Sequence, residues 1–181
     1  MNPAKPSVLL LGDSLIDYGE WHRRLPGCRI ISSGVPGERS AELLRRLSKP
    51  RPGDVADIVV LMSGTNDLLS GDLDFTAHLE QALLLLRQWF PEAAILLTSL
   101  LPFQISAHIP GLRDSIASVN RELKALAKKQ GCHYFDLFSH FEQADDDLFD
   151  YDGVHLNNRG YRLWARELER YITALLAPGL D

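Results

Sequence analysis

Four short segments of the sequence carry side chains suited to nucleophilic attack on a carbonyl group. In the first, Gly12-Asp13-Ser14-Leu15, a serine follows an apolar run. A hydroxyl at the point where a strand turns into a helix lies near a helix N-terminus, whose dipole favours developing negative charge. Ser14 is therefore a candidate nucleophile, although a cap on that helix by Asp13 or Ser14 would explain the same residues.

Two further segments offer hydrogen-bond donors for an oxyanion. Gly34-Val-Pro-Gly37-Glu-Arg-Ser40 holds two glycines three residues apart, which allow close approach of the backbone and leave amides free to point at an anion. Ser63-Gly-Thr-Asn66-Asp67 holds an amide side chain of the kind that stabilises an oxyanion. Each segment taken alone is also typical of an ordinary loop or helix cap.

The fourth segment, Asp152-Gly-Val-His155, pairs a carboxylate with an imidazole three residues later. A carboxylate that folds back on the ring fixes its tautomer and leaves the other nitrogen free to act as a base. A surface turn would explain a lone histidine equally well. Spacing alone does not exclude two other loop histidines, His108 and His140, as the base.

The periodicity predicts the elements that position these segments. Short apolar runs without polar alternation are typical of parallel strands covered on both faces. They lie at Val8–Leu11, Arg29–Ile31, Ile58–Met62, Ile95–Leu100 and His133–Leu137. Between them, apolar residues at spacings of three and four predict helices along Phe75–Phe90, Ile116–Leu126 and Tyr161–Leu175, with a shorter helix over Glu38–Leu47.

Strands that alternate with helices predict βαβ units and a three-layer α/β/α sandwich with about five parallel strands. In such open sheets, ligands bind beyond the carboxyl ends of the strands. All four segments follow predicted strands, so we expect them to meet at one edge of the sheet. A nucleophile, a donor loop, a donor amide and an Asp–His pair are together the parts that acyl transfer needs, and the order Ser…Asp…His is one that builds such a site.

Length and charge set the remaining bounds. At 181 residues we expect a single domain over residues 1–181, large enough to fold without a disulfide or a metal. The formal net charge of −5 argues against nucleic acid or an anionic membrane surface as partner. The apolar run near the N-terminus is too short for an export signal, and no run is long enough to span a bilayer, which predicts a soluble, cytoplasmic protein.

The sequence offers no pattern for a metal or a cofactor, and we expect neither. Cys28 and Cys132 lack the CxxC spacing of zinc sites, and the glycines match neither GxGxxG nor a Walker loop. The acidic stretch Glu142–Asp150 is interpreted as a solvated loop, because it lacks the spacing of a calcium-binding EF-hand.

Taken together, the segments resemble the four sequence blocks of the SGNH, or GDSL, hydrolases: Gly12-Asp13-Ser14-Leu15, Gly37, Asn66 and Asp152-x-x-His155. Gly34–Ser40 and Asp152–Leu156 are similar to the bacterial lysophospholipase/thioesterase branch and to the catalytic subunits of platelet-activating-factor acetylhydrolase. The resemblance runs from about Val8 to Tyr161. Each block is common alone, but all four in order at the family's spacing are specific.

The resemblance implies a role for each matching residue. Ser14 would be the nucleophile, His155 the base and Asp152 the residue that orients it. The oxyanion would be bound by the backbone N–H groups of Ser14 and Gly37 and by the side chain of Asn66. The fold implied is flavodoxin-like, with strand order 2-1-3-4-5. That order puts Cys28 and Cys132 at opposite edges of the sheet, roughly 19 Å apart, so we expect two free thiols.

Two details depart from the family or stay open. Where relatives often have Asn at the end of the second strand, this chain has Ser32-Ser33, which we expect to loosen the loop that follows. The long connection Leu101–Gly111 would form a wall of the acyl pocket, pack on the core or make an oligomer contact. The sequence leaves open whether the chain forms a homo-oligomer.

The function predicted is that of a serine esterase acting on small ester or thioester molecules with short acyl or acetyl groups, lysophospholipid remaining open as a substrate. The alternative is a non-catalytic protein, either flavodoxin-like or an inactive SGNH relative that only binds ligands. A flavin site would need a Ser/Thr/Gly-rich loop after the first strand, whereas this chain has Asp13-Ser-Leu-Ile-Asp17.

Overall fold

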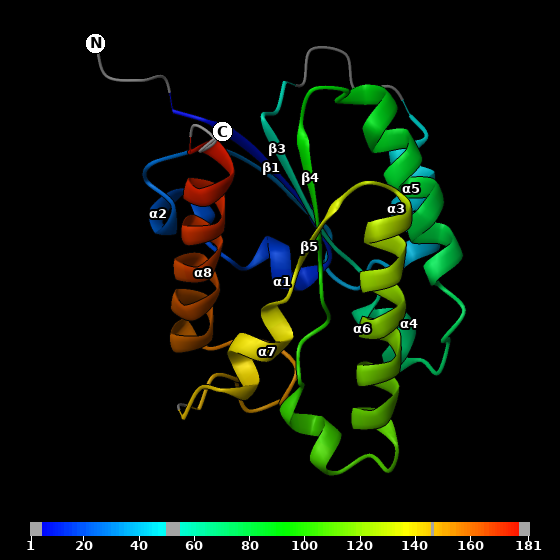
Figure 1. Ribbon diagram of the computed structural model, residues 1–181. Helices are drawn as coiled ribbons and strands as arrows, with labels where there is room; N and C mark the ends of the chain where they lie inside the picture. The colour runs from blue at the N-terminus through cyan, green and yellow to red at the C-terminus, as the bar shows by residue number, and fades with distance from the viewer. Residues whose placement is uncertain (1–4, 50–54, 146, 178–181) are drawn as a thin grey trace.

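The computed structural model describes residues 5–49, 55–145 and 147–177, and places a five-stranded sheet between two layers of helices (Figure 1). Every neighbouring pair of strands is parallel, and the order is β2-β1-β3-β4-β5. This confirms the predicted three-layer architecture and strand order. The strands are β1 (Ser7–Gly12), β2 (Arg29–Gly34), β3 (Ile58–Met62), β4 (Ala94–Thr98) and β5 (His133–Phe135).

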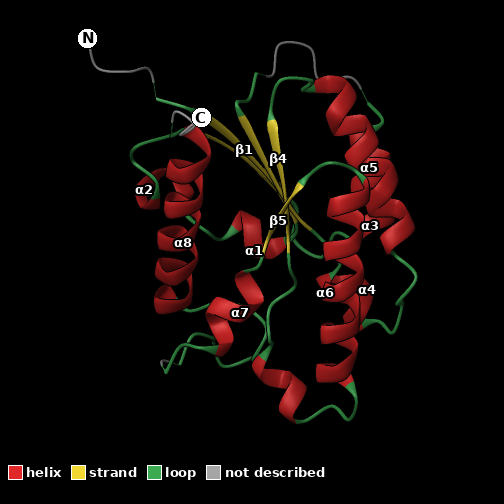
Figure 2. Cartoon of the chain, viewed as in Figure 1, coloured by secondary structure: helices red, strands yellow, loops and turns green. Residues whose placement is uncertain are grey.

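The helices divide between the two faces of the sheet (Figures 1 and 2). One layer holds α1 (Ser14–Asp17), α2 (Trp21–Arg24), α7 (Leu137–Glu142) and α8 (Asn158–Leu176). The other holds α3 (Ser40–Leu47), α4 (Thr65–Leu69), α5 (Thr76–Trp89) and α6 (Leu112–Lys129). A 3₁₀ helix, η1 (Gln104–Ala107), lies in the connection between β4 and α6. No helix in the described part of the chain is both long and apolar enough to cross a membrane.

Burial explains why the central strands read as unbroken apolar runs. Every residue of β1 and of β3 is buried. Each of these strands has neighbours on both sides and helices on both faces, so no position along them faces water. The edge strand β2 is only partly buried, as its position at the edge predicts.

Two strands end earlier than the sequence predicts. The expected strand Ile95–Leu100 stops at Thr98, because the side-chain amide of Asn120 on α6 bonds both backbone groups of Leu100, at 2.8 and 3.0 Å. The expected strand His133–Leu137 stops at Phe135, because Asp136 caps α7 and accepts a bond from Ser139 N–H. In both cases a side chain replaces the sheet partner of the backbone.

Aromatic packing fixes α8 against the helices that follow β1. The rings of Trp21 and Trp164 meet edge to face with centroids 4.9 Å apart, and both side chains are buried. Tyr161 contacts the same pair and donates its hydroxyl to the Leu15 carbonyl oxygen at 3.1 Å. The start of α8 is thereby held beside α1.

The two cysteines are free, as predicted; both are half-buried, and each lies just before an edge strand. Burial raises the pKa of both thiols, so each is a poor nucleophile near neutral pH. We expect alkylation after unfolding without a reductant to add two adducts, measured by intact mass. Native treatment with the same reagent should leave the predicted esterase activity unchanged, and a protein that takes up no adduct would instead contain a disulfide.

Candidate functional site

The first candidate, Ser14, begins α1 directly after β1 and is 8% exposed. Asp13 is the N-cap residue, and its Oδ1 accepts a hydrogen bond from Leu15 N–H at 3.0 Å. The capping role is therefore filled by Asp13, and the Ser14 hydroxyl is left for another partner. Within the described residues, the backbone N–H of Ser14 has no hydrogen-bond partner.

The Asp–His segment forms a tight loop before α8. Oδ1 of Asp152 accepts from the backbone N–H groups of Val154 and His155, both at 2.9 Å. The loop is closed by Asp150 N–H, which donates to the His155 carbonyl at 2.8 Å. Asn157 then caps α8 by accepting from the second and third N–H groups beyond it. Backbone bonds thus orient the imidazole.

A chain of hydrogen bonds joins the two segments. Nε2 of His155 lies 2.9 Å from Ser14 Oγ, and its Nδ1 lies 2.6 Å from Asp152 Oδ2. A carboxylate only accepts, so Nδ1 carries the proton and Nε2 is free to accept from the hydroxyl. Partial burial opposes ionisation of Asp152, but bonds from the imidazole and from the two backbone N–H groups lower its pKa below the ordinary value.

The histidines left open by the sequence lie elsewhere. His140 is on α7 with Nδ1 3.9 Å from Glu167, and His108 is exposed at the end of η1. Of the described histidines, only His155 bonds Ser14. Tyr18 belongs to none of the four sequence segments, but its ring packs on the imidazole of His155 with centroids 5.4 Å apart.

The second segment forms a tight turn beside the end of β1. Glu38 N–H donates to the Val35 carbonyl at 3.1 Å, and Gly37 has a φ of +76°. Pro36 at the second position and a left-handed glycine at the third are the pattern of a type II turn. Gly34 permits the close approach, because a Cβ there would lie 2.3 Å from the backbone nitrogen of Asp17.

The third segment binds to that turn. Asn66, on α4, donates from Nδ2 to the carbonyl oxygen of Glu38 at 3.0 Å. The carboxylate of Asp67 accepts from Ser40 N–H at 3.0 Å and from Ser40 Oγ at 2.7 Å. The two loops that carry the candidate donors Gly37 and Asn66 are thereby joined.

An ion pair that no sequence motif indicates joins the turn to α3. Glu38 is buried, at 6% exposed, and Arg46 on α3 donates to its carboxylate from Nε at 2.8 Å and from Nη2 at 2.7 Å. Arg46 also donates to the hydroxyl and carbonyl of Ser33, at 2.7 and 3.2 Å. The expectation that Ser32-Ser33 loosens the loop therefore does not take account of Arg46, which bonds the end of β2.

Asp13 is the most deeply buried carboxyl group beside Ser14. It is 1% exposed, and its Oδ2 has no hydrogen-bond partner among the described residues. Burial raises the pKa of Asp13 to about 6, and the hydrogen bond from Leu15 N–H offsets only part of that effect. Asp13 therefore takes up a proton at a higher pH than an exposed aspartate.

The long connection Leu101–Gly111 packs in the core at its start. Leu101 and Phe103 are fully buried, and Ile105 N–H donates to the Gly153 carbonyl at 3.1 Å. The connection is thus hydrogen-bonded to the Asp–His loop. Its second half, from Ala107 to Gly111, is exposed.

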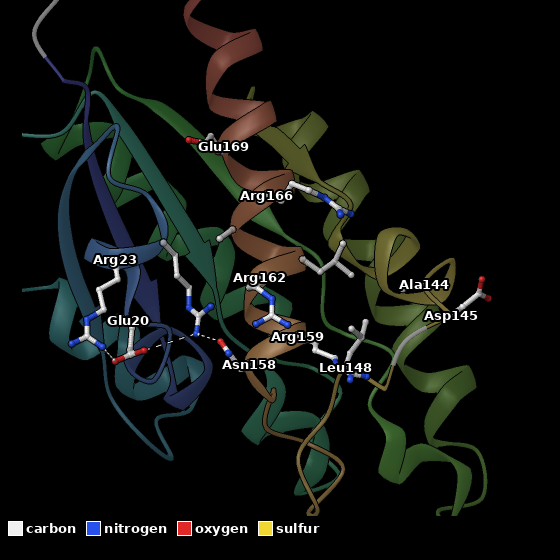
Figure 3. A pocket seen from close by; sticks show the side chains of 13 residues that line it. Glu20, Arg23, Ala144, Asp145, Leu148, Asn158, Arg159, Arg162, Arg166 and Glu169 are labelled. Atoms are coloured by element: carbon white, nitrogen blue, oxygen red, sulfur yellow. Dashed lines mark hydrogen bonds and ion pairs between the residues drawn. The ribbon is translucent and has the colours of Figure 1, made fainter.

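One open cavity lies beside the hydrogen-bonded chain, and a second adjoins the first. A recess of about 700 Å³ is lined by His155 and Asp152 together with polar residues of the same loop and of α8, among them Asp150, Asn157 and Asn158. A groove of about 1030 Å³ continues between α2 and α8, with Glu20, Arg24 and Asn158 common to both (Figure 3). The groove carries arginines and acidic residues in mixture, and Arg23 and Arg24 both lie within 4 Å of Glu20.

The described residues contain no group of three or more His, Cys, Asp or Glu side chains placed to hold a metal ion. Within the acidic stretch Glu142–Asp150, Asp146 lies outside the described residues.

The arrangement brings a hydroxyl, an imidazole and a carboxylate into one line. In this geometry the imidazole can take the hydroxyl proton as the oxygen attacks a carbonyl, while the carboxylate stabilises the imidazolium that forms. The turn at Gly37 and the Asn66 amide lie on the neighbouring strand ends, at the same edge of the sheet.

Comparison with known proteins gives a family match over most of the chain. Residues 10–163 match the model of the GDSL-like lipase/acylhydrolase family. The alpha2 subunit of platelet-activating factor acetylhydrolase IB from Rattus norvegicus is 27% identical over 184 residues, covering 95% of this chain and 78% of the rat protein.

Solved structures show the same fold. A catalytic mutant of an acetylxylan esterase from Geobacillus stearothermophilus superposes with a TM-score of 0.78 at 18% identity, over 93% of this chain and 94% of that one. A member of the lipolytic G-D-S-L family from Veillonella parvula gives 0.74 at 22% identity, over 92% and 98%.

The raised pKa of Asp13 predicts a pH-dependent cost to stability. The pKa of Asp13 is about 6 in the folded state, whereas the ordinary value is 3.8. Between these two values Asp13 is protonated in the folded protein and ionised in the unfolded protein, so the free energy of unfolding falls as pH rises through 6. Asp13→Asn keeps an acceptor for Leu15 N–H but carries no charge. The unfolding free energy of this variant minus that of wild type should therefore increase by roughly 2 kcal/mol as the pH rises from about 4 to about 7.

Urea unfolding of both proteins across that range measures the difference directly. Asp17→Asn, which removes an exposed carboxylate from the same helix, is the matched control and should show no such gain. A stability difference between Asp13→Asn and wild type that stays constant with pH would contradict the raised pKa.

Proposed function

Because the chain belongs to the GDSL-like lipase/acylhydrolase family and is a hydrolase of ester bonds, we propose that it is a serine esterase that forms an acyl-enzyme on Ser14. The observation that carries the proposal is the hydrogen-bonded chain from Ser14 through His155 to Asp152, at 2.9 and 2.6 Å. The alternative of a non-catalytic binding protein is disfavoured by the same family membership.

In the first half of the reaction, Ser14 Oγ attacks the ester carbonyl while His155 Nε2 takes its proton. Asp152 stays ionised and stabilises the imidazolium through the Nδ1–H bond. The protonated His155 then gives its proton to the leaving oxygen or sulfur, and the alcohol or thiol departs. Water, deprotonated by His155, attacks the acyl-enzyme in the second half and releases the acid.

Three donors are proposed to bind the tetrahedral oxyanion: the N–H groups of Ser14 and Gly37 and the side-chain amide of Asn66. The first two have no hydrogen-bond partner among the described residues. Asn66 uses one N–H for the Glu38 carbonyl and keeps the second. Donors fixed by backbone turns need no reorganisation when the charge develops.

We propose a short acyl group and a polar leaving group for the substrate. The recess beside His155 is lined largely by polar side chains, which suit an alcohol that carries hydroxyl or charged groups. The rat relative is named an acetylhydrolase and the Geobacillus neighbour an acetylxylan esterase, and both names refer to acetyl groups.

The nucleophile and base are tested by Ser14→Ala and His155→Ala. Each should lower kcat for p-nitrophenyl acetate by about 10⁴-fold or more, because the residues act as one unit. Thermal unfolding should change little, since neither side chain belongs to the apolar core. Ser48→Ala and His22→Ala, which alter exposed residues of the same types outside the site, are the matched controls. A purified Ser14→Ala protein with near wild-type kcat would overturn the assignment.

Acyl-chain preference is tested with p-nitrophenyl acetate, butyrate, octanoate and dodecanoate. We expect kcat/KM to fall steadily with chain length, because the cavity beside the site is polar and offers no long apolar channel. Ser14→Ala, assayed in parallel, corrects for uncatalysed hydrolysis. A maximum at octanoate or dodecanoate would contradict the short-acyl proposal.

A further inference from the structure

We infer that the buried ion pair between Glu38 and Arg46 positions the Asn66 amide for the reaction, so that both are positioning residues of this esterase. The inference rests on the proposed function, in which Asn66 binds the oxyanion. Neither residue of the pair belongs to the hydrogen-bonded chain of Ser14, and Arg46 lies on α3, after the turn.

The ion pair stabilises the turn through two charge-assisted hydrogen bonds. Two parallel N–H groups of Arg46 meet the two carboxylate oxygens of Glu38, at 2.8 and 2.7 Å. Such bidentate pairs restrict orientation as well as distance. The Glu38 side chain is 6% exposed, so its charge has little water and depends on Arg46 for compensation.

The same guanidinium fixes the other end of the loop. Arg46 Nη1 donates to Ser33 Oγ at 2.7 Å, and Nη2 donates to the Ser33 carbonyl at 3.2 Å. One side chain therefore bonds the end of β2 before the turn and the residue that closes the turn. Gly37, between them, is held by the turn's own bond from Glu38 N–H to the Val35 carbonyl at 3.1 Å, which does not involve Arg46.

The backbone carbonyl of Glu38 connects the ion pair to the Asn66 amide. Its carbonyl oxygen accepts one N–H of the Asn66 amide at 3.0 Å. The two N–H groups of an amide lie in one plane at a fixed angle, so the bond to Glu38 also sets the direction of the second N–H. That second N–H is the one proposed to meet the oxyanion.

A parallel link holds the two loops at the right separation. Asp67, next to Asn66, accepts two bonds from Ser40, and Ser40 Oγ also lies 3.1 Å from His78 Nδ1. Asp67 and Ser40 are both buried. This link places α4 beside α3, and the Glu38–Arg46 pair then determines which way the Glu38 carbonyl faces.

The structure thus predicts an effect on kcat rather than on substrate binding. A displaced Asn66 amide would still permit the ester to bind, because the oxyanion exists only in the tetrahedral state. A misplacement of about 1 Å can cost on the order of 10²-fold in rate.

The test is a double-mutant cycle with p-nitrophenyl acetate. Asn66→Ala should lower kcat by about 10²- to 10³-fold with KM little changed. Arg46→Met should lower kcat by about 10- to 10²-fold, again with little change in KM. In the Asn66→Ala background, Arg46→Met should cost less than about threefold, because the donor that it positions is gone.

Arg45→Met is the matched control, because Arg45 is an exposed arginine on the same helix; it should leave kcat and KM unchanged. Arg46→Lys keeps the charge but loses the bidentate geometry, so it should fall between wild type and Arg46→Met. If Arg46→Met does not fold, the cycle is completed with Arg46→Lys.

The outcomes separate the inference from the proposed function. Near wild-type kcat in Asn66→Ala would overturn the oxyanion role of Asn66, and with it the premise. A large loss in Asn66→Ala with normal kcat in the Arg46 variants would overturn only the positioning role. Equal losses from Arg46→Met in both backgrounds would likewise overturn it, because they would show a structural effect that does not act through Asn66.

Discussion

The hydrogen bond between Ser14 and His155 joins two points of the chain that are 141 residues apart, and the site depends on that junction. The bond requires the start of α8 to lie beside α1. Packing of Trp21 against Trp164 and the bond from Tyr161 to the Leu15 carbonyl hold the two helices together. Long-range burial of aromatic surface therefore maintains a contact whose own hydrogen bond contributes only about 1 kcal/mol.

Three buried carboxylates surround the same edge of the sheet, and the fold treats them differently. Glu38 is compensated by the guanidinium of Arg46, and Asp67 by the hydroxyl and N–H of Ser40. Asp13 has only one such bond, and burial raises its pKa to about 6. The two compensated carboxylates hold loops in place, whereas Asp13 lies next to Ser14 with an acceptor that no described residue satisfies. Hydrogen bonds to buried carboxylates thus tie together the loops that carry the candidate oxyanion donors.

The sequence predicts the sheet well because its signal is local. Runs such as Val8–Leu11 and Ile58–Met62 are apolar throughout, which reflects burial on both faces and needs no knowledge of distant residues. The predicted ends of β4 and β5 are wrong because they depend on side-chain contacts that apolar runs do not reveal. Asn120, on α6, hydrogen-bonds the backbone of Leu100, which therefore does not pair with a neighbouring strand. The side chain of Asp136 caps α7, so the chain becomes helical at Leu137.

Within the candidate site, too, the sequence predicts the residues with a local signal and not those that depend on distant contacts. Ser14, Asp152 and His155 could be identified because each directly follows a strand or forms a short-range pair, and the structure brings them together. Glu38 and Arg46 could not be, since a glutamate before a helix and an arginine within it look like any two solvated charges. Only tertiary packing reveals that the glutamate is buried and that the arginine bonds it. The candidate catalytic residues follow the pattern of the strands, whereas the ion pair depends on packing between segments, which spacing along the chain does not encode.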